Sequence, residues 1–441
     1  MNTAPRPSPA RDLATLGHAD ITAAYLAVRQ ATVALAAPLS AEDCQVQSMP
    51  DASPTKWHLA HVSWFFETFV LERFEPDFRP FDPRFRVLFN SYYQGVGDMH
   101  PRAQRGLIVR PTLSEVMRYR AAVDARMLQL LATRVGDADL AALVTLGLHH
   151  EQQHQELLLT DIKHALSVDA SHAAYAKRWP MTSVRAQPLR WFGFEAGLLE
   201  HGFDAARDGA FCFDNETPRH RAYTAPFELA SRPVNYGEYL AFIDDGGYRR
   251  PDLWLAMGWD WVRSGARTAP LYWHAVDGRW MNHTLQGFVE IDPRTPVCHL
   301  SHFEADAYAR WAGARLPTEI EWEHAARTLQ YPAGTPGRAN FADRGAFHPL
   351  PAEDVAGDEP VQMFGDVWEW TQSAYSAYPG YRALPGAVGE YNGKFMCNQY
   401  VLRGGSCATP AGHVRASYRN FFPTDAQWQF SGVRLARDGG Q

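Results

Sequence analysis

Apolar positions recur at helical spacing from about Asp20 to Leu166, and this pattern predicts helices joined by loops. One predicted helix opens at Ser53-Pro54, where an N-cap residue precedes a proline at the first helical position. Its apolar stripe consists of Trp57, His61, Trp64/Phe65, Thr68 and Leu71.

Two more helices are predicted further along this region. One begins with the capping box Thr112-Leu113-Ser114-Glu115. The other has Leu143, Gly147, His150, His154, Leu157 and Asp161 on one face. Four helices with metal-type residues on apolar stripes predict a helix bundle, in which such residues project into the core.

After the segment 175–188 the pattern changes to short strand-like pieces rich in Gly, Pro and Trp, with brief helices. Two of these helices are well delimited, one by Ser301, Glu304 and Gly313 and one by Thr318 and Glu321. We therefore expect two domains, residues 15–175 and residues 185–438, in a chain of 441 residues. The predicted fold class is multidomain, with an α domain followed by an α+β domain.

The formal charge of −7, from 42 basic and 49 acidic residues, argues against a nucleic-acid partner. The longest apolar runs, such as Leu140 to Leu148, are too short for a membrane span. The first residues lack the apolar region of a secretory signal, and the five cysteines are scattered. These features predict a soluble cytoplasmic protein.

The run His150-Glu151-Gln152-Gln153-His154 places two imidazoles on one helical face, where they can chelate one metal ion. It also matches the H-E-x-x-H pattern of zinc proteases, in which Glu151 would be a general base. His61, on the stripe of another helix, is the natural third ligand. His58 and His149 are expected to point off these stripes. A three-imidazole site leaves open positions, and both zinc hydrolysis and iron oxygen chemistry are compatible with it.

Two motifs of the first half, Trp57-His58-Leu59-Ala60-His61 and His150-Glu151-Gln152-Gln153-His154, resemble the ergothioneine-biosynthesis sulfoxide synthases. In that family a DinB-like four-helix bundle is fused to a domain like the formylglycine-generating enzyme, which has a C-type-lectin-like fold. The resemblance implies that His61, His150 and His154 bind iron(II).

The second half resembles the formylglycine-generating enzyme through several motifs in order. Most of their Trp, Gly and Arg residues are expected to pack the core. That enzyme uses a close pair of cysteines, whereas Cys407 stands alone, so its activity is not expected; Cys44, Cys212, Cys298, Cys397 and Cys407 are interpreted as small buried residues. The motifs are 215–220, 315–323, 365–370, 403–406 and 432–435.

The resemblance also implies roles for residues in two predicted loops, 90–106 and 418–422, and for Gln153 beside a ligand. Tyr93 is the expected catalytic acid, with Tyr92 assisting, because a phenol can supply a proton. Arg102 and Arg105 are expected to hold the carboxylate of the sulfur donor through paired hydrogen bonds. Aromatic faces attract a trimethylammonium group, and the residues expected to hold trimethylhistidine are Gln153, Asn420, Phe421 and Phe422.

The resulting hypothesis is an iron(II) enzyme that uses dioxygen to join cysteine to the imidazole C2 of N-alpha-trimethylhistidine (hercynine) and oxidises the sulfur. Gamma-glutamylcysteine is an alternative donor, and a selenoneine synthase using a selenium sugar is an alternative enzyme. A DinB-like zinc thiol transferase or hydrolase, and a non-catalytic binding module, are alternatives of other classes. The sequence does not predict the oligomeric state.

Overall fold

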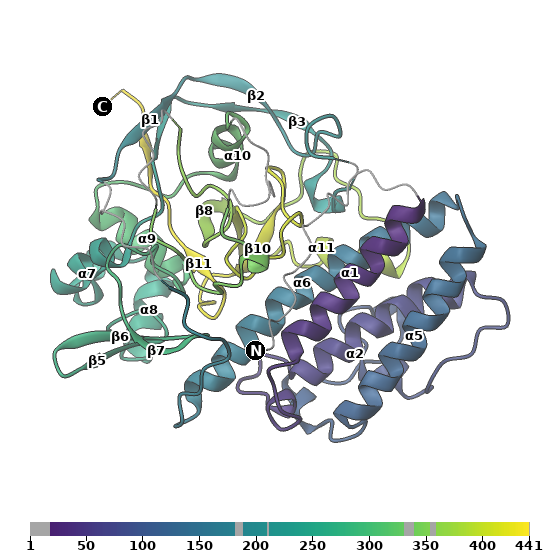
Figure 1. Cartoon of the computed structure of the whole chain (residues 1–441). Helices are drawn as coiled ribbons and strands as arrows, with labels where there is room; N and C mark the ends of the chain where they lie inside the picture. Colours follow the sequence, from purple (N-terminus) through teal and green to yellow (C-terminus); the bar gives the residue numbers. More distant parts are fainter. Residues whose placement is uncertain (1–17, 181–187, 210, 330–338, 353–358, 441) are drawn as a thin grey trace.

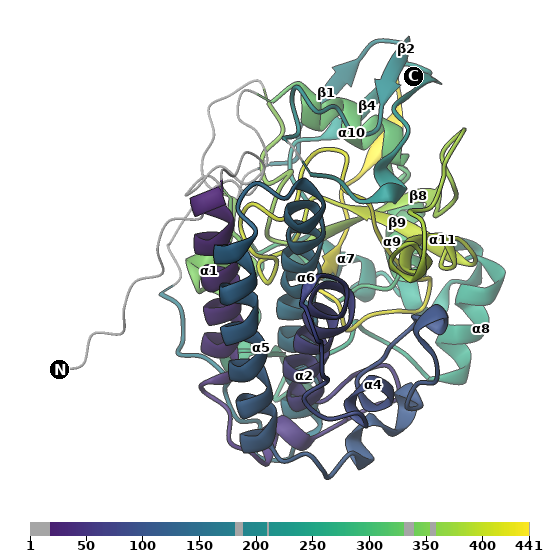
Figure 2. The same ribbon diagram turned by 90° about the vertical axis from the view of Figure 1, so that its right-hand side faces the viewer.

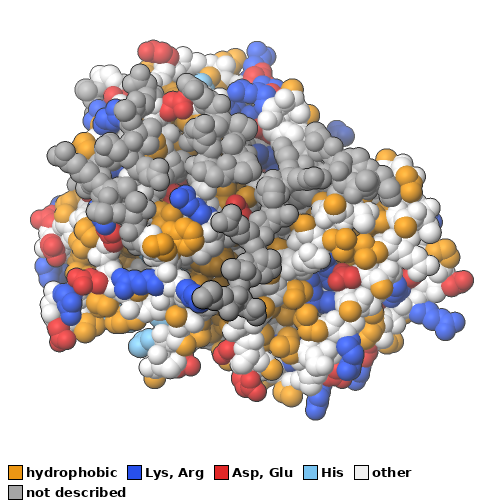
Figure 3. Space-filling model, in the orientation of Figure 1, with side chains coloured by type: hydrophobic (Ala, Val, Ile, Leu, Met, Phe, Trp, Pro, Cys, Tyr) orange, Lys and Arg blue, Asp and Glu red, His pale blue; other side chains and the backbone are white. Residues whose placement is uncertain are grey.

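A computed structural model describes residues 18–180, 188–209, 211–329, 339–352 and 359–440. The described chain forms a helical part followed by a part that mixes short helices and small sheets, as Figure 1 shows. In the described residues, no helix combines the length and the apolar character that a passage through a lipid bilayer requires. On the face drawn in Figure 3, acidic and basic side chains are interspersed.

The helical part is a bundle of four long helices that run side by side in Figure 2. Helix α2 is buried at every position, so it occupies the interior of the bundle. The bundle confirms the predicted architecture of the first domain. Its helices are α1 (His18–Ala36), α2 (Thr55–Phe65), α5 (Leu113–Thr133) and α6 (Ala138–Val168).

Of the two helix starts predicted in the bundle, one is confirmed and one is wrong. The capping box of α5 forms, since the Glu115 N–H donates to Thr112 Oγ1 at 3.3 Å and the Thr112 N–H donates to Glu115 Oε2 at 2.7 Å. The predicted N-cap at Ser53 is wrong, because α2 begins at Thr55 and Pro54 takes the cap position. The Ser53 N–H donates instead to Asp161 Oδ2 on α6.

After α2 the chain keeps a helical course through a π-helical segment, Phe66–Leu71, and the short helix α3, Glu72–Phe74. Helix α6 approaches this segment at Gly147. A Cβ at that position would lie 2.6 Å from the Phe66 ring, so only glycine permits this distance between the helices.

Over its described residues the second part contains four small sheets and five α-helices, with the capping boxes at Ser301 and Thr318 formed as predicted. A four-stranded sheet has the order β10-β9-β8-β11, from strands Asn420–Pro423, Gln399–Arg403, Trp368–Ala374 and Ser431–Gly432. A three-stranded sheet has the order β1-β4-β12, from Trp191–Phe194, Phe227–Ala230 and Ala436–Asp438. The others pair β2 (Gly197–His201) with β3 (His220–Thr224), and β5 (Trp273–Val276), β6 (Arg279–Thr284) and β7 (Gly287–Glu290). The helices are α7 (Tyr236–Asp244), α8 (Ala256–Ser264), α9 (His302–Trp311), α10 (Glu319–Arg327) and α11 (Glu390–Gly393).

The motif residues of the second half pack its core, as predicted. Trp322, Trp368 and Trp370 are fully buried, and the Trp322 indole donates to Glu369 Oε2 at 2.6 Å. The Arg434 guanidinium is held by the same carboxylate at 2.7 Å. These polar groups bind one another inside the protein and are not directed at a ligand. This explains why such motifs specify a fold rather than a reaction.

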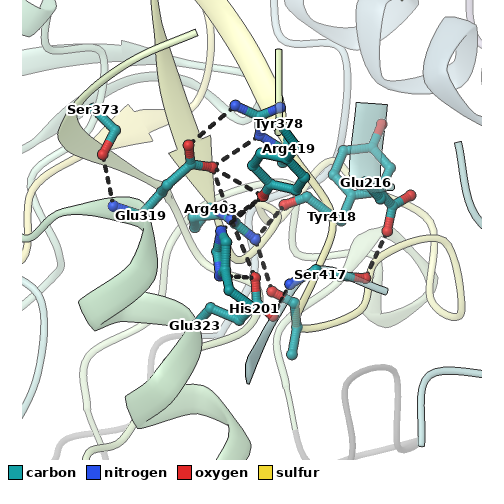
Figure 4. Close-up of polar contacts among 12 residues, drawn as sticks. His201, Glu216, Glu319, Glu323, Ser373, Tyr378, Arg403, Ser417, Tyr418 and Arg419 are labelled. Atoms are coloured by element: carbon teal, nitrogen blue, oxygen red, sulfur yellow. Dashed lines mark hydrogen bonds and ion pairs between the residues drawn. The ribbon is translucent and has the colours of Figure 1, made fainter. Parts of the chain in front are cut away.

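A buried ionic network, drawn in Figure 4, fixes strands β9 and β10 against α10. The Glu319 carboxylate binds Arg403 at 2.9 Å and Arg419 at 2.8 Å. Glu323 binds His201 at 2.8 Å and Arg403 at 3.3 Å. Because Arg419 directly precedes β10, this network sets the position of that strand. The prediction of a loop at 418–422 is therefore wrong from Asn420 onward.

The cysteines follow the prediction only in part. Cys44, Cys298 and Cys407 are buried, but Cys212 is half-buried and Cys397 is exposed. All five are free thiols.

Candidate active site

Three imidazoles meet in the bundle, one from α2 and two from α6. His61, His150 and His154 each offer a ring nitrogen that lies within 4.8 Å of those of the other two rings. The Nε2 atoms of His61 and His150 are 3.2 Å apart. His61 and His150 are buried, and His154 is half-buried toward a cleft.

The protonation of these rings suits a metal ion. His61 Nδ1 donates to the Phe89 carbonyl at 2.7 Å, which leaves a lone pair on Nε2. Burial lowers the pKa of all three rings, that of His150 to about 4, so they are neutral near pH 7. His150 Nδ1 is a buried nitrogen without a partner. With metal–nitrogen bonds of about 2.1 Å, two ligand nitrogens 3.2 Å apart can share one ion. These residues therefore fit an iron or zinc ion.

Glu151 does not face this cluster. Its carboxylate accepts hydrogen bonds from Arg29 Nη1 at 2.9 Å, Thr32 Oγ1 at 2.6 Å and Arg120 Nη2 at 3.1 Å. Burial alone would raise its pKa, but the two guanidinium groups outweigh burial and lower the pKa to about 2. Glu151 is thus a structural anion on the opposite side of α6. A general base of the zinc-protease kind is excluded at this position.

His61 is the centre of a stack of planar groups. Its ring lies between Trp57, at a centroid distance of 4.5 Å, and Trp64, at 5.4 Å. The guanidinium of Arg105 lies 3.5 Å from the centroid of Trp57, and the Tyr93 ring lies 5.7 Å from Trp64. The stack holds the imidazole at a fixed angle and places an arginine and a phenol at its two ends.

Arg105 is a buried cation that binds neutral groups. Its Nη1 donates to Ser53 Oγ at 2.8 Å and its Nη2 to Ser91 Oγ at 2.9 Å. Burial lowers its pKa to about 9. Arg102 is exposed, and its Nη1 donates to the Tyr92 hydroxyl at 2.5 Å. Both guanidinium groups line the cleft, where they can bind an anion.

The two tyrosines differ in environment. Tyr93 is buried, burial raises its pKa, and its hydroxyl forms no hydrogen bond with any described residue. Tyr92 is half-buried with a φ of 21° and contacts the Phe395 ring at 4.9 Å. The following residues are tied to the second domain, because the N–H groups of Gln94 and Gly95 donate to Glu390 at 3.0 and 2.7 Å. The second domain thereby fixes the loop that carries Tyr92 and Tyr93.

Gln153 of α6 and the strand β10 form a further part of the cleft lining. Gln153 Nε2 donates to the Tyr418 hydroxyl at 2.9 Å. Phe421 stacks on Tyr375 at 4.1 Å and faces Phe395 at 5.7 Å. The structure brings all eleven predicted site residues to this one cleft: His61, Tyr92, Tyr93, Arg102, Arg105, His150, Gln153, His154, Asn420, Phe421 and Phe422.

Helix α6 is also fixed on the second domain by Glu156. Its carboxylate accepts hydrogen bonds from Trp368 Nε1 at 2.8 Å, Ser406 Oγ at 2.5 Å and Thr409 Oγ1 at 2.8 Å. Ser406 closes the motif 403–406, so the loop that resembles the formylglycine-generating enzyme here binds the helix that carries two of the three histidines.

Of the two expectations about neighbouring histidines, the one for His58 is wrong. His58 does not point away from the site, since its Nδ1 lies 2.9 Å from His154 Nδ1 and its Nε2 lies 2.9 Å from Asp161 Oδ2. Periodicity failed here because α2 is buried on all sides, so an apolar stripe does not define its inner face. His149 does point off the stripe of His150 and His154: its ring stacks on Phe211 of the second domain at 4.0 Å and does not line the cleft.

Other cleft residues were missed because they come from parts of the chain without a local signal. Tyr391 and Phe395 lie in and after the short helix α11, and Tyr418 precedes β10. Only the fold brings them into the cleft of the histidines. The aromatic residues around 391–395 are a signal in composition only, which gives no position in space.

Comparison with known proteins matches both halves. Residues 24–158 match the DinB superfamily, and residues 194–439 match the sulfatase-modifying factor enzyme 1-like domain. These matches confirm the predicted fold class, a DinB-like bundle followed by a domain like the formylglycine-generating enzyme.

Three curated relatives extend this result. The hercynine oxygenase of Mycolicibacterium thermoresistibile is 34% identical over 418 residues, covering 88% of this chain and 88% of the relative. That of Mycobacterium tuberculosis is 34% identical over 411 residues, covering 88% and 92%. The formylglycine-generating enzyme of Streptomyces coelicolor is 32% identical over 226 residues, covering 44% of this chain and 71% of the relative.

Proposed function

Since the chain belongs to the hercynine oxygenase family, a family of oxidoreductases, we propose that it joins cysteine to the imidazole C2 of hercynine and oxidises the sulfur. One observation carries the proposal: three neutral imidazoles line a cleft that also holds two arginines and, among the described residues, a tyrosine hydroxyl without a hydrogen bond, that of Tyr93. The product is the sulfoxide precursor of ergothioneine.

The reaction balances with dioxygen. The imidazole C–H and the thiol S–H bonds break, and a C–S and an S–O bond form. One oxygen atom enters the sulfoxide, and the other leaves as water with the two hydrogens. The substrates give four electrons to dioxygen, so no further reductant is needed.

His61, His150 and His154 would hold ferrous iron. When bound, iron supplies the redox chemistry with dioxygen that the side chains of the cleft cannot supply. The site has three nitrogen ligands and no carboxylate, which leaves coordination positions for substrates.

The arginines bind the sulfur donor. Arg105 brings a positive charge without a carboxylate partner into the cleft, and Arg102 lies beside Tyr92 at its entrance. A donor carboxylate bound there receives charge-assisted hydrogen bonds and has its thiol directed toward the histidines. Cysteine is the preferred donor, and gamma-glutamylcysteine is the alternative.

Gln153 and the residues of β10 bind hercynine. Phe421 and Phe422 offer aromatic faces to a trimethylammonium group, which cannot donate a hydrogen bond. Gln153 uses its amide N–H on Tyr418, so its oxygen remains free to accept an N–H from the substrate imidazole. Asn420 adds a polar contact at the same strand.

Tyr93 supplies a proton from its hydroxyl. Burial keeps the phenol protonated at neutral pH, and among the described residues nothing competes for its hydrogen. Tyr92 is bound to Arg102 and has a supporting role.

The test is product analysis with defined donors. Protein purified without oxygen and loaded with iron(II) is mixed with hercynine, dioxygen and, in separate reactions, cysteine, gamma-glutamylcysteine or a selenium sugar. We expect oxygen uptake that needs both hercynine and cysteine, and a sulfoxide whose mass is the sum of the two substrates less two hydrogen atoms and plus one oxygen atom. Loading with zinc should give no product. No oxygen uptake with any donor, or hydrolysis with zinc, would contradict the proposal.

A further inference from the structure

We propose that Asp161 and His58 form a positioning relay that orients the ring of His154 and fixes its proton for metal binding. The inference rests on the proposed metal site but not on the identity of either substrate.

Asp161 lies on α6, two helical turns after His154, and His58 lies on α2 one turn before His61.

The geometry is a chain of three groups. Asp161 Oδ2 lies 2.9 Å from His58 Nε2, and His58 Nδ1 lies 2.9 Å from His154 Nδ1. All three side chains line the cleft, and both Asp161 and His58 are buried. Hydrogen bonds of this length at both rings of the chain fix the plane of each imidazole.

The direction of each hydrogen bond follows from Asp161. The same Oδ2 accepts the Ser53 N–H at 2.8 Å, so this oxygen is an acceptor and carries no proton. His58 Nε2 must then be the donor, and in the neutral His58 ring the lone pair is on Nδ1. That lone pair accepts the proton of His154 Nδ1, and the lone pair of His154 is confined to Nε2.

The relay treats His154 differently from the other two rings. His61 Nδ1 donates to a neutral carbonyl, that of Phe89, and His150 Nδ1 has no partner. His154 donates toward a carboxylate through one intervening ring. A carboxylate partner raises the basicity of a metal-binding imidazole, so His154 is the strongest of the three donors.

Ser53 contacts both the relay and Arg105. The Ser53 N–H holds Asp161, and the Ser53 hydroxyl accepts a hydrogen bond from Arg105 at 2.8 Å. One residue therefore fixes both the outer end of the relay and the guanidinium proposed to bind the donor carboxylate. The position of His154 and the position of Arg105 cannot shift independently.

The test uses cobalt(II) as the probe and needs no turnover. Metal-free wild-type protein and the variants Asp161→Ala, Asp161→Asn and His58→Phe are titrated with cobalt(II) against a competing chelator, with the visible spectrum as second readout. We expect about 10- to 100-fold weaker binding and an altered spectrum for Asp161→Ala and His58→Phe. Asp161→Asn keeps an oxygen oriented by Ser53, so a smaller loss is expected.

A matched control is His164→Ala, which removes another imidazole of α6, one bonded to Ser48 at 2.7 Å outside the cleft. It should bind cobalt(II) like the wild type. If Asp161→Ala or Asp161→Asn melts like wild type and binds with unchanged affinity and spectrum, the relay is wrong. If the wild type itself binds no cobalt(II), the metal site and with it the proposed function are wrong.

Discussion

Arg105 combines features that a purely structural arginine does not need. It is 5% exposed, it binds two serine hydroxyls, and its Nε is a buried nitrogen without a partner. Among the described residues no carboxylate pairs with it, and a buried cation without a counter-ion lowers stability. This supports the proposal that a bound carboxylate supplies the negative charge.

Replacing Arg105 by Gln should separate binding from folding. We expect the KM for cysteine to rise about 10- to 100-fold, since a charge-assisted pair contributes about 1.5–3 kcal/mol. The KM for hercynine should change little, and the melting temperature should stay the same or rise because an unpaired buried charge is removed. Steady-state kinetics with each substrate varied, and a thermal melt, measure both effects. A large rise in the KM for hercynine alone would contradict the assignment.

Tyr93 allows an equally clean substitution, because its hydroxyl makes no hydrogen bond with any residue that the structure describes. Tyr93→Phe should fold like the wild type. It should form sulfoxide at about one-hundredth of the wild-type rate or below, as expected for loss of a proton donor. The matched control is Tyr92→Phe, which loses the Arg102 contact and should be affected less. Product mass spectrometry over time gives both rates, and equal rates for Tyr93→Phe and wild type would exclude the role.

At the scale of elements, the site depends on how closely α6 approaches the helix formed by α2 and the π-helical segment. Gly147 lies one turn before His150, against the rings of Phe65 and Phe66. The three histidines converge because no side chain separates the helices at this level. The small residue therefore sets the distance between ligands that lie on different helices.

A Gly147→Val variant should push the helices apart. Valine improves helix propensity, but its side chain would overlap Phe66, and overpacking costs about 1–3 kcal/mol. We expect a lower melting temperature and weaker metal binding. Ala142→Val, at an exposed position of the same helix, is the control and should change neither. A Gly147→Val protein with unchanged metal affinity would show that the close approach of the two helices does not determine the geometry of the metal site.

The sequence predicted elements better than it predicted faces. The capping boxes at Thr112, Ser301 and Thr318 form, because they are local interactions with a fixed spacing. The face of α2 could not be predicted, since a helix buried on all sides carries no amphipathic signal. His58 was misplaced for this reason, and Tyr391 was missed because its contacts with the site are made only in the folded chain.

At the scale of the whole molecule, buried neutral histidines make stability depend on pH. Burial lowers the pKa of His302, in α9, from 6.5 to about 4, and lowers that of His413 to about 3. Between pH 6.5 and 4 the unfolded chain binds more protons at these positions than the folded chain does. The free energy of unfolding therefore falls as the pH falls through this interval.

His302→Leu should reduce this dependence. Two pH units below the ordinary pKa, the buried neutral histidine lowers the free energy of unfolding of the wild type by about 2 kcal/mol. Leucine has no proton to bind, so the variant should not show this loss. Urea unfolding of both proteins at pH 7 and pH 4.5 measures the difference, and His302 lies in the second domain outside the cleft. If both proteins lose the same free energy, His302 is not a source of the acid sensitivity. Asp366, whose pKa burial raises to about 6, acts in the opposite direction in both proteins.

The carboxylate of Glu156 has a consequence for how such a protein can change over time. It is two residues from His154, yet its three hydrogen-bond donors among the described residues belong to the second domain. A mutation at Ser406 or Thr409 should therefore change how α6 is held without touching a histidine. Exchanging either half of the chain with that of a distant relative should then require a compensating change at Glu156, Ser406 or Thr409.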